Sequence, residues 1–318
     1  MPRLDIVIPV FNEAEGLPAL HSSLMAAVGG LAYDLRVLYV DDGSSDDTQA
    51  VLGALRSSDH RVQFLGLSRN FGHQAALTAG LDHADADVVV MLDGDGQHPP
   101  ELIPEMLKLH ELGYDIVQAQ RMDSANSLKV STGRGFYWLL NRIGEVNLSP
   151  GAADFRLISR EVLSALRKFN EYHRFLRGLF SWVGFKSVLL PYAPKTRLAG
   201  TSKYSVAKML RLAADGLFSF SLVPLRLAFV LGLVFLVFAI WEVAYVLRFF
   251  LTNEVDRLVP GWSSVIIILT VSSGIIMVLL GFIGIYVGMI FQEVKHRPAY
   301  LIKGSHSTLN ADVRRPLE

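Results

Sequence analysis

Short apolar runs alternate with stretches of helical periodicity over the first 120 residues. The runs have the length and the Val, Ile and Leu content of buried strands, and they predict strands at Leu4–Val10, Leu35–Val40, Gln63–Leu67, Val88–Leu92 and Asp115–Ala119. Helices are predicted between them, near Glu15–Val28, Asp47–Leu55, Gly72–His83 and Pro100–Glu111. This alternation predicts an α/β fold with a parallel sheet and helices on both of its faces.

Two later segments are apolar around their whole circumference. Leu227–Leu247 contains one charged residue, Glu242, and Val265–Phe291 contains none. At about 1.5 Å per residue, the first segment would form a helix roughly 31 Å long, close to the hydrocarbon thickness of a bilayer. The sequence therefore predicts two transmembrane helices, at about 227–247 and 265–291.

Basic residues lie mainly before the first of these segments and after the second, with few between them. The cations outside the pair are Lys203, Lys208, Arg211, Arg226, Lys295, Arg297 and Lys303, whereas the connecting loop holds Arg257, with Arg248 at its edge. The positive-inside rule then predicts a multi-pass protein of the inner or plasma membrane, with the N-terminal domain and both termini in the cytoplasm. Gly284 and Gly288 form a Gly-x-x-x-Gly pair that favours helix contact, within one chain or in a homo-oligomer.

Two basic amphipathic stretches precede the first apolar segment. Tyr172–Lys186 and Ser205–Phe220 interleave Phe, Leu and other apolar residues with Lys and Arg. Such helices are typical of the headgroup plane of a membrane, and we expect that placement here. The alternative is that their apolar faces pack against the sheet.

The net charge of zero combines an acidic part and a basic part. Residues 1–120 carry 6 Lys+Arg against 18 Asp+Glu, whereas residues 121–211 carry 16 against 5. The acidic part can hold a metal ion, and the basic part suits phosphates or an anionic membrane surface. The chain has no cysteine, which excludes thiolate metal sites, and it lacks Gly-x-Gly-x-x-Gly and P-loop motifs, which disfavours dinucleotide oxidoreductases and P-loop enzymes.

Acidic turns follow three of the predicted strands. They read PVFNE at Pro9–Glu13, DDGSSDDT at Asp41–Thr48 and DGDGQHPP at Asp93–Pro100. Ligands of parallel α/β sheets bind beyond the carboxyl ends of the strands, where these turns are predicted to lie. An Asp-x-Asp turn brings two carboxylates together, and a divalent cation relieves their repulsion. Mg²⁺ or Mn²⁺ bound there would neutralise a diphosphate leaving group.

Four ordered motifs resemble those of glycosyltransferase family 2. They are PVFNEAE, VDDGSSDDT, the stretch from LSRNFGHQ to DGDGQHPPE, and RLAGTSKYS. Within the family they are similar to the polyprenyl-phosphate glycosyltransferases, which include dolichol-phosphate mannose synthase, and NFGHQ with two spans looks most like the bactoprenol glucosyltransferase branch. The resemblance implies a GT-A (Rossmann-like) nucleotide-sugar-binding domain followed by two transmembrane helices. It also implies inverting, Mg²⁺- or Mn²⁺-dependent transfer of a hexose, favoured as glucose from UDP-glucose, to a polyprenyl phosphate in the bilayer.

The family pattern also implies roles for individual residues. The family positions that form the nucleoside pocket match Pro9, Phe11, Glu13, Val40 and Asp42. Those that approach the donor diphosphate match Asp93, Gly94 and Asp95, and the metal ligands match Asp95 and Gln97. Arg197 and Lys203 resemble the loop that closes over the donor phosphates, and Arg121 and Arg134 resemble positions that hold the acceptor phosphate. Arginine suits these sites because its planar fork binds two phosphate oxygens at once.

The need for a general base is open at this point. A phosphate monoester has a second pKa near 6 and is already mostly dianionic at pH 7, so it can act as its own nucleophile. Asp154, in GAADFRLIS, occupies the region where related transferases place a base. The alternative for Asp154 is an ion pair with Arg156 or Arg160.

The resemblance divides the chain into four parts. We expect a GT-A catalytic domain over 1–170, amphipathic segments and the donor-closing loop over 171–222, the two spans over 223–292, and a cytoplasmic tail over 293–318 that is flexible after Tyr300. Three other functions are alternatives: a GDP-mannose-dependent polyprenyl-phosphate mannose synthase, a processive polysaccharide synthase, and a non-catalytic membrane scaffold. The processive class is disfavoured because the chain lacks a Gln-x-x-Arg-Trp motif. No nucleic-acid partner is expected.

Overall fold

The computed structural model describes residues 1–122, 152–169, 171, 174–193, 223–251, 261–304 and 307. The chain divides into two compact units. One unit combines Met1–Gly216 with Arg297–Glu318, and the other is Leu217–His296. The end of the chain therefore belongs to the same unit as its beginning.

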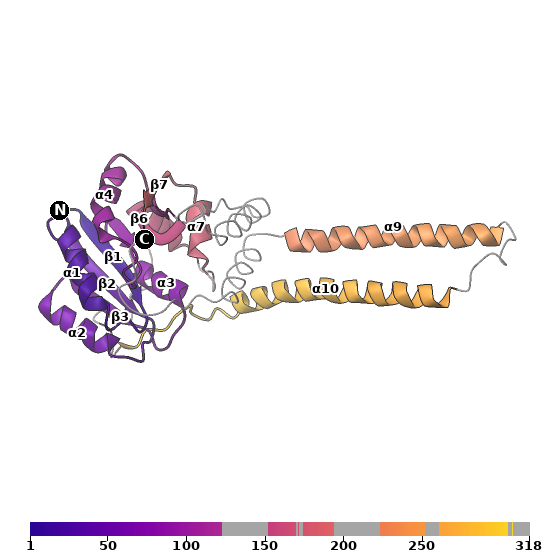
Figure 1. Ribbon diagram of the computed structural model, residues 1–318, viewed down its shortest axis with the longest axis horizontal. Coiled ribbons are helices and arrows are strands. Elements are labelled where there is room, and N and C mark those ends of the chain that lie inside the picture. Colours follow the sequence, from indigo (N-terminus) through magenta and orange to yellow (C-terminus); the bar gives the residue numbers. More distant parts are fainter. Residues whose placement is uncertain are drawn as a thin grey trace. The chain divides into compact units, whose positions relative to one another are not determined.

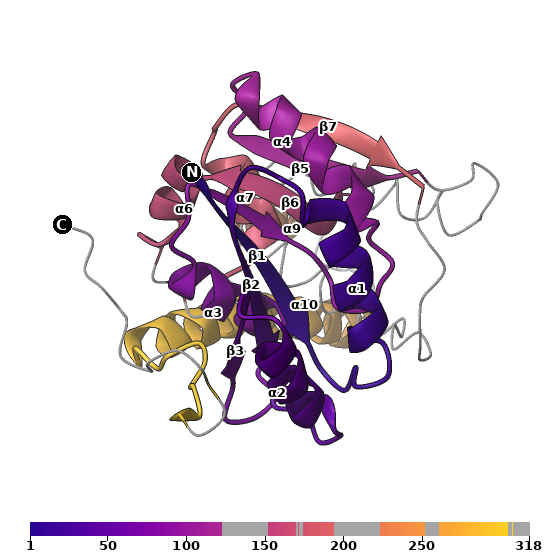
Figure 2. The same ribbon diagram turned by 90° about the vertical axis from the view of Figure 1, so that its left-hand side faces the viewer.

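A seven-stranded sheet forms the centre of the first unit (Figures 1 and 2). Its order is β3-β2-β1-β4-β6-β5-β7, with bounds β1 Arg3–Val10, β2 Asp34–Asp41, β3 Val62–Gly66, β4 Val88–Met91, β5 Ile116–Arg121, β6 Ala152–Ser159 and β7 Ser187–Tyr192. The first five strands confirm those predicted from the apolar runs. The prediction of a parallel sheet holds for these five strands, but the whole sheet is mixed, because β6, which was not predicted, lies antiparallel to both β4 and β5.

Helices cover both faces of the sheet, as Figure 2 shows. One face carries α1 (Leu17–Val28), α2 (Thr48–Ser58) and α4 (Ile103–Glu111), which follows the short 3₁₀ turn η1 (Pro100–Leu102). The other face carries α3 (His73–His83), α6 (Arg160–Leu166) and α7 (Leu176–Trp182). The central strands are apolar on both sides, since β1 buries Ile6 and Ile8 toward the first face and Val7 toward the second.

Helix α7 lies in the stretch that we expected at a membrane surface. Its apolar residues Leu176, Leu179 and Phe180 are buried in the protein. The membrane placement is therefore wrong for these three side chains, and the alternative of packing is confirmed. Trp182 is 55% exposed, and its ring packs edge-on against Phe169.

The segment after the last helix is bound to the edge of the sheet. The Ser68 N–H donates to the Leu301 carbonyl at 2.8 Å, and the Lys303 N–H donates to the Gly66 carbonyl at 2.8 Å, which forms an antiparallel bridge. The Tyr300 hydroxyl donates to Asp82 at the end of α3. The expected flexibility after Tyr300 is therefore wrong for Leu301–Lys303.

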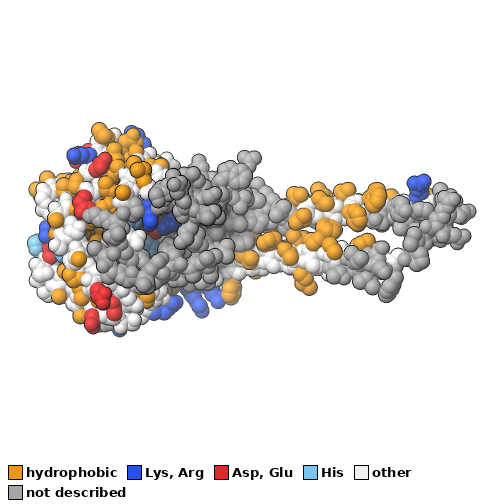
Figure 3. Space-filling model, viewed as in Figure 1, with side chains coloured by type: hydrophobic (Ala, Val, Ile, Leu, Met, Phe, Trp, Pro, Cys, Tyr) orange, Lys and Arg blue, Asp and Glu red, His pale blue; other side chains and the backbone are white. Residues whose placement is uncertain are grey.

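Two long helices make up the described part of the second unit: α9 (Val223–Leu251) and α10 (Trp262–Val294). Exposed apolar side chains, orange in Figure 3, line the described parts of both helices. Among the described residues, one stretch is long and apolar enough to cross a membrane, Val271–Val294, with a mean hydropathy of 2.5 and no burial by the protein. One membrane-spanning candidate is therefore supported.

Gly80 allows α3 to pack closely on β1. A Cβ atom at Gly80 would lie 2.2 Å from Val7 Cγ1, whereas a Cβ atom at Gly53 in α2 would meet no atom within 4 Å. We expect Gly80→Ala to destabilise the protein by about 1–3 kcal/mol through overpacking. Gly53→Ala is the matched control and should stabilise by up to about 1 kcal/mol through helix propensity. Thermal melting of the full chain in detergent measures both, and a Gly80→Ala variant that melts at or above the wild type would contradict the packing argument.

Candidate active site

The loops after β1 and β2 are joined by hydrogen bonds. The Asn12 N–H donates to Ser44 Oγ at 2.9 Å, and the Ser45 N–H returns a bond to Asn12 Oδ1 at 2.9 Å. The Glu13 N–H donates to Thr48 Oγ1 at 3.0 Å. Asn12 has a φ of 54°, a left-handed conformation that asparagine tolerates better than most residues. The two predicted nucleoside-pocket loops thus form one continuous surface at the carboxyl edge of the sheet.

Asp42, at the end of β2, organises the start of α3. Its carboxylate is buried and accepts the Phe71 N–H at 2.7 Å and the Gly72 N–H at 2.9 Å. Burial raises the pKa of Asp42, and these two hydrogen bonds oppose that rise. The residue after this turn is His73, the first residue of α3.

The Asp-x-Asp loop after β4 packs directly on β1. A Cβ atom at Gly94 would lie 2.8 Å from Val10 Cγ1 and 2.9 Å from the Pro9 carbonyl oxygen, so only glycine fits there. Asp95 Oδ1 accepts the Gln97 N–H at 3.0 Å, which closes the turn on itself. The loop therefore presents Asp93 and Asp95 beside the end of β1.

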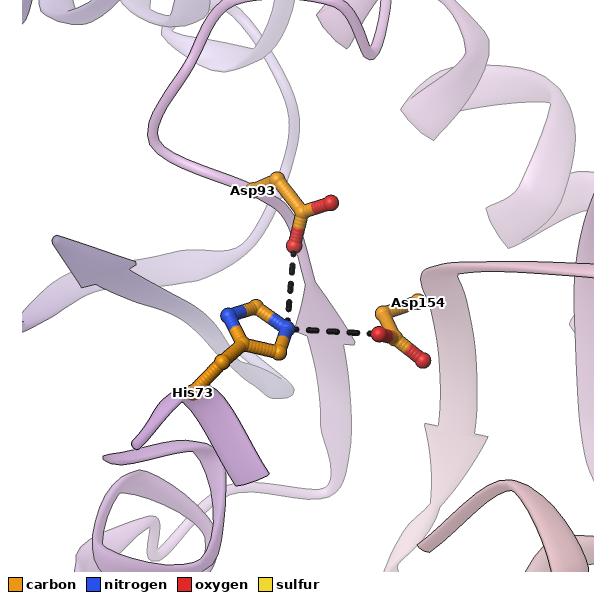
Figure 4. A group of neighbouring side chains, drawn as sticks. All are labelled: His73, Asp93 and Asp154. Carbon is orange, nitrogen blue, oxygen red and sulfur yellow. Dashed lines mark hydrogen bonds and ion pairs between the residues drawn. The ribbon is translucent and has the colours of Figure 1, made fainter. Parts of the chain in front are cut away.

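His73 joins this loop to β6 (Figure 4). Its Nε2 atom lies 3.4 Å from Asp93 Oδ1 and 3.2 Å from Asp154 Oδ2. Asp154 is 7% exposed and also accepts two hydrogen bonds from Arg177 of α7, from Nε and from a terminal nitrogen, both at 2.8 Å. Four charged groups from α3, the β4 loop, β6 and α7 thus converge on one point.

Their charges shift the pKa values in opposite directions. Burial alone would lower the pKa of His73, but the hydrogen bond to Asp154 and the charges of Asp93 and Asp154 outweigh it and raise this pKa to about 9. Burial alone would raise the pKa of Asp154, but Arg177 and His73 hold it well below its usual range. At neutral pH the pair is therefore an imidazolium and a carboxylate.

The other predicted site residues are distributed as follows. Arg121 ends β5 and is exposed, while Arg134, Arg197 and Lys203 lie outside the described residues. Among the described residues, Asp154 forms no ion pair with Arg156 or Arg160, the two alternative partners named above. Arg156 donates to Gln118 and stacks 3.9 Å from the Phe180 ring centroid, and Arg160 pairs with Asp85 and Asp87.

Sequence analysis missed His73 and Arg177 as site residues. His73 stands in the NFGHQ motif, at the end of the loop that leads from β3 into α3, and this position at a helix start could have indicated it. Arg177 gave no such signal, because it lies within an amphipathic stretch among other basic residues. Its partner Asp154 is 23 positions away and on another element.

The carboxylates of the Asp-x-Asp loop suit a divalent cation. Among the described residues Asp93 Oδ1 is buried without a hydrogen-bond donor, and such an oxygen gains from a nearby positive charge. Asp95 and Gln97 add oxygen donors, which Mg²⁺ and Mn²⁺ prefer. His73, Asp93 and Asp154 also lie close enough to bind an ion, with ligand atoms within 4.8 Å of one another, but Arg177 already occupies Asp154.

A mixed α/β sheet with an Asp-x-Asp loop at its carboxyl edge defines a GT-A-like glycosyltransferase domain. The sequence matches Glycosyl transferase family 2 over residues 5–167, and the chain belongs to this family. It is therefore a glycosyltransferase, and the resemblance noted in the motifs is confirmed.

Relatives match along nearly the whole chain. The putative glycosyltransferase CsbB of Bacillus subtilis (strain 168) is 38% identical over 94% of this chain and 91% of its own. The SfII prophage-derived bactoprenol glucosyl transferase of Shigella flexneri is 36% identical over 96% and 98%. A solved structure described as a mycobacterial protein has a TM-score of 0.50 at 17% identity, covers 68% of this chain and 73% of its own, and supports the fold alone.

The His73–Asp154 pair predicts a pH-dependent part of the stability. The pKa of His73 is raised from 6.5 to about 9 in the folded protein, so the stabilisation is full below pH 6.5 and is lost as the pH rises through about 9. Because His73 is 43% exposed, solvent screening limits the effect to about 1 kcal/mol. The melting difference between the wild type and His73→Asn should therefore shrink between pH 6.5 and 9.5. The exposed His60→Asn is the control, and a difference that stays constant over this window would contradict the ion pair.

Proposed function

We propose that the protein transfers a hexose, glucose from UDP-glucose, to a polyprenyl phosphate in the membrane, with inversion at the sugar. The observation that carries this proposal is the match to relatives named bactoprenol glucosyl transferase, which extends over 96% of the chain at 36% identity and therefore reaches beyond the catalytic domain into the long apolar helices. A match of the catalytic domain alone would say nothing of the acceptor, whereas a shared membrane part fits an acceptor held in the bilayer.

On the donor side, the joined loops after β1 and β2 are proposed to hold the nucleoside, through Pro9, Phe11, Glu13, Val40 and Asp42. Asp93, Gly94 and Asp95 then approach the diphosphate, and Asp95 and Gln97 would hold Mg²⁺ or Mn²⁺. When bound, that ion would neutralise the charge that develops on the leaving diphosphate. Arg197 and Lys203 are proposed to close over the donor phosphates.

The acceptor needs no general base in this scheme. An oxygen of the dianionic phosphate attacks the anomeric carbon, the bond from that carbon to the diphosphate breaks, and the nucleoside diphosphate leaves. Asp154 is poorly suited to be a base because its pKa is held well below its usual range, and a base works best with a pKa near the working pH. We propose instead that Asp154 orients His73 and Arg177, while Arg121 and Arg134 bind the acceptor phosphate.

The bound segment after α10 supports an even number of membrane crossings. Leu301 and Lys303 hydrogen-bond to residues at and just after the end of β3, so they must be on the same side of the membrane as the sheet. A single crossing by α10 would put them on the opposite side. We therefore propose that α9 crosses as well, with the first unit in the cytoplasm.

The absence of cysteine makes this topology testable by single-cysteine labelling. Asp256→Cys, which lies between the two helices in the sequence, should react with a membrane-impermeant maleimide on intact cells. Ser57→Cys, on the exposed end of α2, should react only after lysis. Labelling of both positions, or of Ser57→Cys alone, on intact cells would refute the proposed topology.

Transfer itself is tested with purified full-length protein, undecaprenyl phosphate, Mg²⁺ or Mn²⁺ and a panel of radiolabelled nucleotide sugars. Label from UDP-glucose should become lipid-extractable as a monosaccharide product. Preference for GDP-mannose would identify a mannose synthase, and a polymeric product would identify a processive synthase. If no donor gives a lipid-linked label, the proposed transfer is refuted and a non-catalytic scaffold is the remaining interpretation.

Two substitutions separate the metal ligand from the proposed orienting residue. Asp95→Ala should reduce transfer by about 10³-fold or more, because it removes a ligand of the ion that stabilises the leaving group. Asp154→Asn should leave a measurable rate, lower by about 10–100-fold, because orientation is impaired but no base is lost. Initial rates at saturating donor measure both. Wild-type turnover by Asp95→Ala would disprove its metal role, and complete loss in a folded Asp154→Asn would favour a base.

A further inference from the structure

His73 lies between two carboxylates that belong to different parts of the site. Asp93 comes from the loop after β4, Asp154 from β6, and the imidazole enters from the first residue of α3 (Figure 4). The three ligand atoms lie within 4.8 Å of one another. Without the imidazole, the two carboxylates would face each other across a gap that a divalent cation could bridge.

The start of α3 is held in this place from two sides. Asp42 binds the Phe71 and Gly72 N–H groups that precede His73. On the other side, Gln74 Oε1 accepts the Leu176 N–H at 3.3 Å, which ties the first turn of α3 to α7. The imidazole is thus positioned by the helix that carries it as well as by its own two partners.

A cation between Asp93 and Asp154 would be in the wrong place for the proposed reaction. Asp154 is bound on both oxygens by Arg177, so an ion there would have to share this carboxylate with a guanidinium. An ion held there would also lie near the ion proposed at Asp95 and Gln97, and the two like charges would repel each other. Excluding it would leave the Asp-x-Asp loop free to bind the metal with the donor diphosphate.

We propose that His73 is the resident counter-ion of this site: its N–H group takes the position between Asp93 and Asp154 that a divalent cation would otherwise occupy. His73 thereby directs the catalytic ion to Asp95 and Gln97 and acts as a positioning residue. This inference rests on the proposed metal-dependent transfer.

The test is a Mn²⁺ titration of the full-length protein in detergent, without donor, followed by electron paramagnetic resonance. His73→Ala and His73→Gln remove the charge, and they should bind Mn²⁺ at least about tenfold more tightly than the wild type. His73→Lys keeps a cation and should bind Mn²⁺ like the wild type. Adding Asp154→Asn to His73→Ala should abolish the gain, and the exposed His60→Ala should change nothing.

Steady-state kinetics give a second readout. His73→Ala should lower kcat by about tenfold or more while the KM for the nucleotide sugar changes by less than about threefold, because the loops proposed to hold the nucleoside are unchanged. Melting curves verify that each variant is folded.

Other outcomes overturn the inference. Unchanged Mn²⁺ binding in folded His73→Ala and His73→Gln would mean that His73 only packs, and weaker binding would mean that it is itself a metal ligand. The titration needs no substrate, so the two proposals fail separately. If the wild type transfers sugar but all His73 variants bind Mn²⁺ with the same affinity as the wild type, the counter-ion role is refuted. If the Mn²⁺ affinities change as expected but no lipid-linked product forms, the proposed function is refuted.

Discussion

Negative charges converge at the carboxyl edge of the sheet, and the fold must hold them together before any substrate binds. Each carboxylate is stabilised by a different kind of donor. Asp42 accepts two backbone N–H groups, Asp154 accepts the guanidinium of Arg177, and Asp93 faces the imidazole of His73. Burying an unpaired charge costs free energy, so each of these carboxylates can be buried only where such a donor lies beside it.

The same contacts tie distant elements to the reaction centre. Asp42 lies in the proposed nucleoside pocket, yet it also holds the turn that presents His73. Arg177 belongs to α7, whose apolar side is buried in the protein, so packing of that helix sets the position of its guanidinium. An acceptor phosphate that carries its own negative charge fits a centre in which cations, rather than a base, are arranged around the reacting groups.

Contacts within the first unit also connect the segment after α10 to the helices around the site. The chain leaves this unit before α9 and returns after α10, and Tyr300 then binds Asp82 at the end of the helix that begins with His73. Arg174, just ahead of α7, binds the same carboxylate at 2.9 Å. Asp82 thus joins the segment after α10, α3 and the residues that lead into α7.

The sequence by itself determined the first five strands, the helices between them, and the acidic loops that line the site, because apolar periodicity and turn residues are local signals. Local signals do not say which strands become neighbours, so only the tertiary structure decided that β6 enters antiparallel between β4 and β5. That insertion brings Asp154 to His73, 81 positions away, and to Arg177. Burial likewise decided that the apolar side of α7 packs against the rest of the domain, since a basic amphipathic pattern suits a membrane surface and a domain surface equally well.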